Sequence, residues 1–233
     1  MNGRLREFGA GLAAVAPLAA GAVPFGLIYG VVAIQAGIAP LLAIAIASIV
    51  FAGSAQFMIT QLVAAGSPPF VVVTSVLTIN LRHALYSAAL ARALAPLSRP
   101  WKVVLAYLLT DEAYAAAYHR FTDDERSATR HWFLLGCGLG LWLAWQIACV
   151  VGVTLGGTIP ATWSLDFAAT LTFIAIVVPL LVDRAALAAM LAAGITAVAL
   201  HQLPYKLAII AAALAGIGAG VALDRSPSGK VPE

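Results

Sequence analysis

Ionisable side chains lie in the middle of two long apolar stretches of this sequence. Arg82 occurs within Phe70–Ala95, and Asp111 and Glu112 occur within Trp101–Tyr118. A charged side chain at the centre of a membrane-spanning helix costs about 2.5–3.5 kcal/mol on insertion scales. Mutual pairing inside a helix bundle offsets that cost, so we predict that Arg82 lies close to Asp111 or Glu112. A salt bridge that only fixes the register of two helices is the structural alternative.

Uncharged polar groups and a histidine accompany these charges in the apolar stretches. They are Gly53, Ser54, Gln56, Asn80 and His83. Small polar residues in membrane helices often do no more than hydrogen-bond a neighbouring helix, which is worth about 0.6 kcal/mol on average. His83 differs because it follows Arg82 directly, and an ionisable residue inside a membrane is a functional candidate by default.

The sequence carries no pattern typical of membrane enzymes. It has no GxSxG nucleophile elbow, no His-Glu-x-x-His metal site and no phosphate-binding loop. Cys137 and Cys149 lie in one apolar stretch, where a continuous helix would hold them about 18 Å apart, too far for a disulfide. No metal-ligand spacing occurs. We therefore expect neither catalysis nor a bound metal or other cofactor.

Composition places these residues in a multi-span membrane protein. The chain is 62% hydrophobic and 10% charged, with a mean hydropathy of +0.97, whereas a soluble surface needs about 25–35% charged residues. The first apolar stretch is too long for a cleavable signal peptide, so a retained span is expected. The net charge of +3 does not indicate nucleic-acid binding, because the basic residues lie at span ends.

Continuous apolar runs without alternation predict an all-α transmembrane bundle in one integral membrane domain, residues 1–233. Eight candidate spans are Phe8–Gln35, Ile38–Ala65, Phe70–Ala95, Trp101–Tyr118, His131–Leu155, Trp163–Val182, Ala185–Leu200 and Pro204–Leu223. Seven is the alternative count, because the last two are short. A first helical block (8–119) and a second (131–223) flank a polar loop (120–130), and a cytoplasmic tail (224–233) follows.

Helix-breaking residues inside two spans predict interruptions near the middle of the membrane. They are Pro17, Gly21, Pro24 and Gly26 in the first span and Gly53 in the second. Proline removes a backbone donor and kinks a helix. Irregular backbone at membrane depth survives only against protein or a water-filled cavity, and secondary transporters build substrate sites from such broken helices. A kink or close helix packing without a site is the alternative.

Counting lysine and arginine at span ends predicts the orientation. With the N-terminus inside, the inner ends carry Arg4, Arg6, Arg120, Arg126, Arg130, Arg184, Arg225 and Lys230, and the outer ends carry Arg92, Arg99, Lys102 and Lys206. This favours two cytoplasmic termini. The Arg92–Lys102 cluster contradicts the rule, so either an earlier segment is re-entrant or the charge rule is weak here.

Several segments together resemble the AzlC family. They are Pro24-Phe-Gly26, Phe51-Ala-Gly-Ser-Ala-Gln-Phe57, Asn80-Leu-Arg-His-Ala-Leu-Tyr86, Thr110-Asp-Glu112, Leu165-Asp-Phe167 and Phe173–Arg184. The likeness covers nearly the whole chain, and its specific motifs lie in the first half.

This resemblance implies a large subunit of a two-component exporter in the bacterial inner membrane. AzlC-like proteins export branched-chain amino acids (leucine, isoleucine, valine and, at the margin, methionine). They work with a small AzlD-type membrane subunit and use the proton motive force. No nucleotide-binding motif occurs here, so a secondary transporter driven by protons is expected.

The expected mechanism assigns a role to each polar group. A substrate carboxylate would meet backbone N–H groups near Gly53–Ser54 or Arg82, the ammonium would meet Asp111 or Glu112, and phenylalanines would hold the side chain. The expected substrate-binding residues are Phe25, Phe51, Gly53, Ser54, Gln56, Phe57, Asn80 and Arg82. The expected proton-coupling residues are His83, Asp111 and Glu112. A passive channel and a non-transporting scaffold subunit are the rival functions.

Overall fold

The computed structural model describes residues 3–123, 129–158, 181, 183–203 and 207–223, and every regular element in them is a helix. The helices are α1 (Gly3–Gln35), α2 (Pro40–Ile49), α3 (Gly53–Ala64), α4 (Pro69–Leu94), α5 (Arg99–Leu108), α6 (Asp111–Asp123), α7 (Arg130–Gly156), α9 (Arg184–Ala199) and α10 (Leu207–Leu223). The all-α membrane bundle is confirmed. Most of the candidate span Trp163–Val182 and the tail 224–233 lie outside the described residues.

Three described helices are long and apolar enough to cross a membrane: α1, α4 and α7. Their 33, 26 and 27 residues correspond to about 40–50 Å at 1.5 Å per residue. α9 and α10 are shorter apolar helices that pack against each other. Within the predicted polar loop 120–130, residues 120–123 continue α6.

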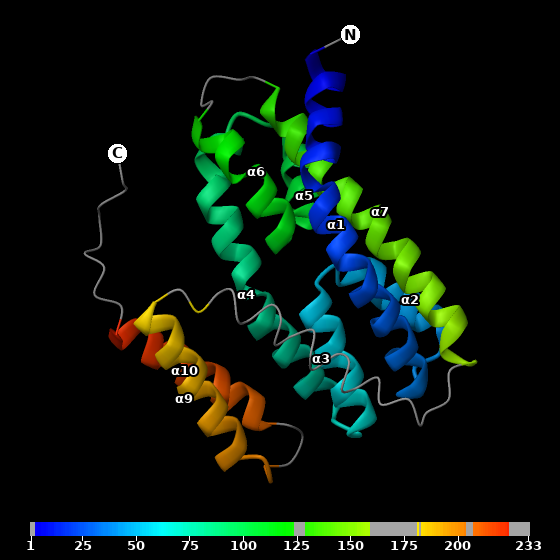
Figure 1. Ribbon diagram of the computed structural model, residues 1–233, viewed down its shortest axis with the longest axis vertical. Helices are drawn as coiled ribbons and strands as arrows, with labels where there is room; N and C mark the ends of the chain where they lie inside the picture. The colour runs from blue at the N-terminus through cyan, green and yellow to red at the C-terminus, as the bar shows by residue number, and fades with distance from the viewer. Residues whose placement is uncertain (1–2, 124–128, 159–180, 182, 204–206, 224–233) are drawn as a thin grey trace.

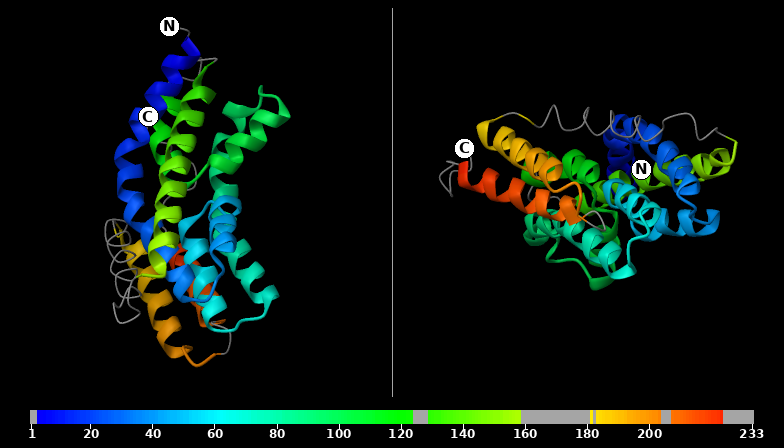
Figure 2. Two further views of the ribbon diagram at one scale, coloured as in Figure 1. Left: turned by 90° about the vertical axis from the view of Figure 1, so that its right-hand side faces the viewer. Right: turned by 90° about the horizontal axis from the view of Figure 1, so that it is seen from below.

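α1 and α7 run side by side in the same direction and share the most extensive helix–helix contact of the described residues (Figures 1 and 2). Glycines on both helices allow their backbones to touch. At Gly26, for example, a Cβ would lie 2.8 Å from the Ala148 Cβ. Pro17 and Pro24 do not interrupt α1, which is helical throughout. The predicted break in the first span is therefore wrong, because close packing against α7 supports the proline-containing helix.

The predicted break in the second span is present, and the chain also turns back there. α2 ends at Ile49, and α3 begins at Gly53. Ala43 in α2 and Phe57 in α3 both contact Tyr29, through the Tyr29 hydroxyl and ring respectively. The two helices thus lie at the same depth. Ile38–Ala65 is a re-entrant hairpin that enters and leaves at one end of the bundle.

A second hairpin enters from the opposite end. α5 starts beside the first turn of α7, where Trp101 contacts His131, and it ends deep in the bundle, where Tyr107 contacts Trp142. After an interruption at Leu109–Thr110, α6 returns to the starting level, where Arg120 pairs with Glu7. This break was not predicted, because neither proline nor glycine occurs near it.

The first six helices therefore form two units of inverted orientation (Figure 1). Each unit has a long helix (α1 or α4), a half-helix of 10 residues (α2 or α5) and a return helix of 12 or 13 residues (α3 or α6). α4 runs opposite to α1, since its C-terminal Ala93 lies against Arg130 at the end where α1 begins. Inverted repeats that bring discontinuous helices together are a common plan of secondary transporters.

The two ends of this bundle differ in charge. The end that we call the charged end carries Arg4, Arg6, Arg92, Arg99, Lys102, Arg120 and Arg130. At the opposite, uncharged end, the described turns 36–39, 65–68 and 157–158 contain no lysine or arginine. The predicted outer location of Arg92–Lys102 is therefore corrected: a re-entrant segment precedes the cluster and returns it to the side of the N-terminus.

Single-cysteine labelling distinguishes this topology from eight successive crossings. In a background with Cys137 and Cys149 replaced by alanine, Gly3→Cys and Ser98→Cys should react with an impermeant maleimide from the same membrane face. Ala65→Cys should react from the opposite face, because only the α2–α3 hairpin lies between it and the far end of α1. If Ala65→Cys and Gly3→Cys label from one face, the hairpin assignment is wrong.

Candidate functional site

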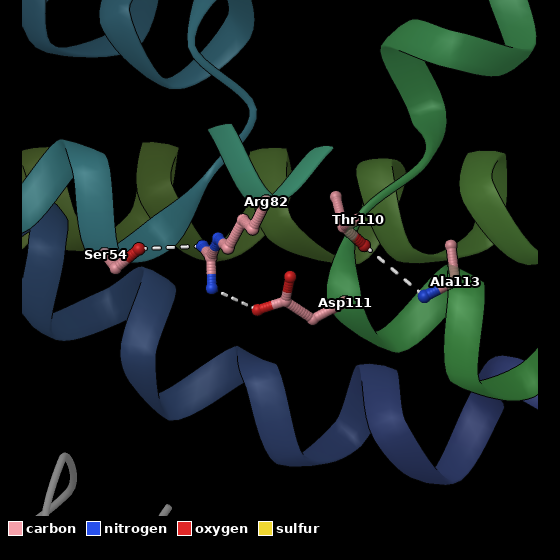
Figure 3. A network of polar contacts seen from close by, with 5 residues as sticks. All are labelled: Ser54, Arg82, Thr110, Asp111 and Ala113. Atoms are coloured by element: carbon pink, nitrogen blue, oxygen red, sulfur yellow. Dashed lines mark hydrogen bonds and ion pairs between the residues drawn. The ribbon is translucent and has the colours of Figure 1, made fainter. Parts of the chain in front are cut away.

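The predicted ion pair lies where the tips of the two hairpins meet on α4. The Arg82 guanidinium forms an ion pair with Asp111 through Nη1 and Oδ2, and its Nη2 donates a hydrogen bond to Ser54 Oγ at 2.7 Å. Figure 3 shows Arg82 between the first residues of α3 and α6. Both side chains of the pair are partly buried. A single guanidinium thus bridges the two inverted units.

Two helix N-termini point their positive ends toward this ion pair. α6 begins with Asp111 and Glu112, and Thr110 Oγ1 accepts a hydrogen bond from the Ala113 N–H at 3.4 Å. The acidic pair complements the α6 dipole. α3 has neither an acidic first turn nor a side-chain hydrogen bond at its cap. Its first backbone N–H groups have no intrahelical acceptor, so this tip favours an anion.

Side chains from three helices satisfy the carbonyls freed at the end of α2. Gln56 Nε2 donates to Val50 O at 2.6 Å and to Ala47 O at 3.4 Å, and Gln146 Nε2 donates to Ala47 O at 3.0 Å. Tyr107 donates its hydroxyl hydrogen to Ser48 O. A broken helix at membrane depth needs such partners. Because Tyr107 belongs to α5, the second hairpin supplies a hydrogen-bond donor to the broken helix end in the first.

A cavity of about 230 Å³ lies between the hairpin tips and α4. Its walls are the end of α2 with the following tip (Ile49–Ala52), one face of α4 (Val76, Asn80 and His83) and the end of α5 (Ala106, Tyr107 and Leu109). The volume is below the roughly 300–1,000 Å³ typical of drug-sized ligands. A small molecule with a compact apolar group fits this size.

The structure brings most of the predicted site residues to this meeting point. Arg82 contacts both Ser54 and Asp111, whereas Phe51, Asn80 and His83 line the cavity. Glu112 follows Asp111 and is half-buried. His83 contacts the Tyr86 ring at 6.2 Å between centroids.

Three predicted substrate-binding residues have other surroundings. Phe57 is buried edge-on against Tyr29 in the core, and Phe25 packs against the same core. Neither lines the cavity, so Phe51 is the one member of the predicted phenylalanine trio that does. Gln56 is fully buried and its amide is engaged by α2 carbonyls and by Trp145. We therefore regard Gln56 as a support of the broken helix.

The residues that hold the tips in place were not predicted from the sequence. Tyr107 lies on α5 and Asp111 on α6, because the break separates the two helices. Gln146, Trp142 and Trp145 from α7 were not singled out. Their signal is the run Trp142-Leu-Ala-Trp-Gln146, which brings three hydrogen-bond donors into the middle of an apolar helix.

Comparisons with known proteins agree on one family. The model of the AzlC protein family matches residues 17–159, which contain both hairpins and α7. The inner membrane protein YgaZ of Escherichia coli (strain K12) is 30% identical over 141 residues, 60% of this chain and 57% of that protein. An uncharacterized membrane protein of Archaeoglobus fulgidus is 31% identical over 214 residues, 90% of this chain and 92% of the relative. No solved structure matches significantly.

Replacing Gln56 with leucine should destabilise the fold. The substitution leaves the Val50 carbonyl without its side-chain donor, and an unsatisfied buried polar group costs about 1–3 kcal/mol. Gln61→Leu makes the same change on the exposed face of α3 and serves as the control. Unfolding midpoints in detergent should fall for Gln56→Leu and stay near wild type for Gln61→Leu. Equal midpoints would contradict the supporting role.

Proposed function

The chain belongs to the AzlC protein family, and on that premise we propose that it is the large subunit of a secondary transporter that exports branched-chain amino acids. The relatives support a membrane protein with a transport-related role. The matched region of the Escherichia coli relative spans 57% of that protein. The substrate, the direction of transport and the partner are therefore part of the proposal.

The ion pair between Arg82 and Asp111 carries this proposal. A free amino acid bears one negative and one positive charge, and the site presents one group of each sign at the meeting of the two hairpins. The substrate carboxylate would bind the uncapped α3 N-terminus and Arg82. The ammonium would bind Asp111, with Glu112 one residue away. Arg82 Nε and Asp111 Oδ1 are buried without a hydrogen-bond partner in the described residues, so both groups retain bonding capacity.

Proton coupling would act through the same pair. A proton taken up by Asp111 removes the charge that holds Arg82, and the link that runs from the α6 tip through Arg82 of α4 to Ser54 at the α3 tip then loses its ionic contact. Glu112 and His83 are the neighbouring groups that could receive or deliver this proton. Such an element has two arrangements whose balance a proton shifts, which is the requirement for coupled transport.

The charge distribution supports an orientation in the bacterial inner membrane. Lysine and arginine concentrate at one end of the bundle and are missing from the described turns at the other, and basic residues favour the cytoplasmic face. We propose that the charged end and the N-terminus are cytoplasmic. The predicted cytoplasmic C-terminus and the small AzlD-type partner subunit remain part of the same proposal, carried by the family likeness.

Counterflow of labelled leucine in proteoliposomes tests this function. Vesicles that contain the chain together with the small subunit should take up label against preloaded unlabelled leucine, and an imposed proton gradient should drive net transport. A passive channel would let leucine equilibrate without exchange, and an uncoupler would not change the rate of this equilibration. If neither uptake nor equilibration occurs with the partner present, the scaffold function replaces the transporter.

Asp111→Asn should reduce proton-driven leucine transport by roughly tenfold or more, because asparagine cannot take up the proton and leaves Arg82 without its ionic partner. Asp183→Asn is the matched control. Asp183 caps α9 by accepting a hydrogen bond from the Ala186 N–H at 2.7 Å, and asparagine is an equally good cap. An Asp111→Asn variant that keeps the wild-type unfolding midpoint and wild-type transport would contradict the assignment.

A further inference from the structure

The cavity between the hairpin tips has walls of unequal polarity. Seven of its ten lining residues are apolar, and they come from the α2 tip, from α5 and from Val76 of α4. The Tyr107 hydroxyl is engaged with Ser48 O and Trp142 Nε1. The polar groups that remain, Asn80 and His83, both belong to α4. The cavity therefore presents one polar wall and an apolar remainder.

Asn80 is the polar group that most needs a partner. Its side-chain oxygen is buried and accepts no hydrogen bond within the described part of the chain. A buried acceptor left in this condition costs about 1–3 kcal/mol. A ligand with an N–H group at the polar wall would satisfy it, while hydrocarbon on the same ligand filled the apolar remainder.

The cavity and the ion pair occupy adjoining faces of α4. His83 lines the cavity, and the preceding residue, Arg82, points to Ser54 and Asp111 instead. Successive helical residues are about 100° apart at 3.6 residues per turn. A ligand whose charged groups are held at the ion pair therefore has an apolar space around the side of the same helix.

We propose that this cavity is the side-chain pocket of the transporter, and that Ala106 and Val76 set the size of the side chain that it accepts. The inference rests on the proposed function, and it adds a cavity site not assigned from the sequence. Ala106 is small and exposed, and it lines the cavity from α5 while Val76 lines it from α4. A larger residue at 106 shortens the pocket, and a smaller one at 76 deepens it.

Competition in counterflow tests the pocket. Unlabelled alanine, valine, leucine and phenylalanine would compete with labelled valine in vesicles that contain both subunits. In Ala106→Leu, competition by leucine relative to alanine should fall roughly tenfold, because the loss of space for one or more methylene groups changes discrimination by about 10–200-fold. Val76→Ala should improve competition by phenylalanine. Ala88→Leu, at an exposed α4 position outside the cavity, should keep the wild-type order.

The outcomes separate the pocket from the transport function. If Ala106→Leu and Val76→Ala weaken all four competitors equally while wild type transports, the pocket is wrong and the function stands. If wild type does not transport, the same ligands are compared by the rise in unfolding midpoint that they cause in detergent. A rise with leucine in wild type and Ala88→Leu that disappears in Ala106→Leu supports the pocket. No rise in wild type with any of the four overturns it.

Discussion

An interrupted helix inside a membrane must find hydrogen-bond partners for its broken ends within the protein, and the centre of this molecule depends on that constraint. Gln56, Gln146 and Tyr107 supply donors to the end of α2. They come from three helices, so the break, the meeting of the hairpins and the position of Arg82 are specified together. Loss of one donor would disturb the site from a distance.

Two kinds of contact divide the bundle into a stationary and an adjustable part. α1 and α7 approach through glycines along most of their length, which leaves little space for relative movement. The hairpins instead meet through Arg82 of α4, which contacts both tips, and through a few hydrogen bonds around a cavity. A secondary transporter needs a rigid part and a part that changes position around a fixed site, and this division is consistent with the proposed role.

The sequence predicted the helical class, a break near Gly53 and a contact of Arg82 with Asp111 or Glu112. The contact was predictable because a charge buried without a partner has a large free-energy cost. It did not predict that the two broken segments turn back. Ile38–Ala65 and Trp101–Tyr118 are long enough and apolar enough to cross the bilayer, and hydropathy does not encode direction. The misplaced Arg92–Lys102 cluster was the one hint. Phe25 and Phe57 lie in the core and away from the cavity, because an aromatic residue is as suited to a core as to a ligand pocket.

The uncharged turns at the far end of the bundle have a consequence for biogenesis. Within the described first seven helices, the segments that must be carried through the lipid during insertion are the short turns 36–39 and 65–68 and the end of α7 at 157–158. None contains a lysine, arginine, aspartate or glutamate. Their translocation therefore carries no ionised side chain through hydrocarbon, and these turns add little to the free-energy barrier of membrane insertion.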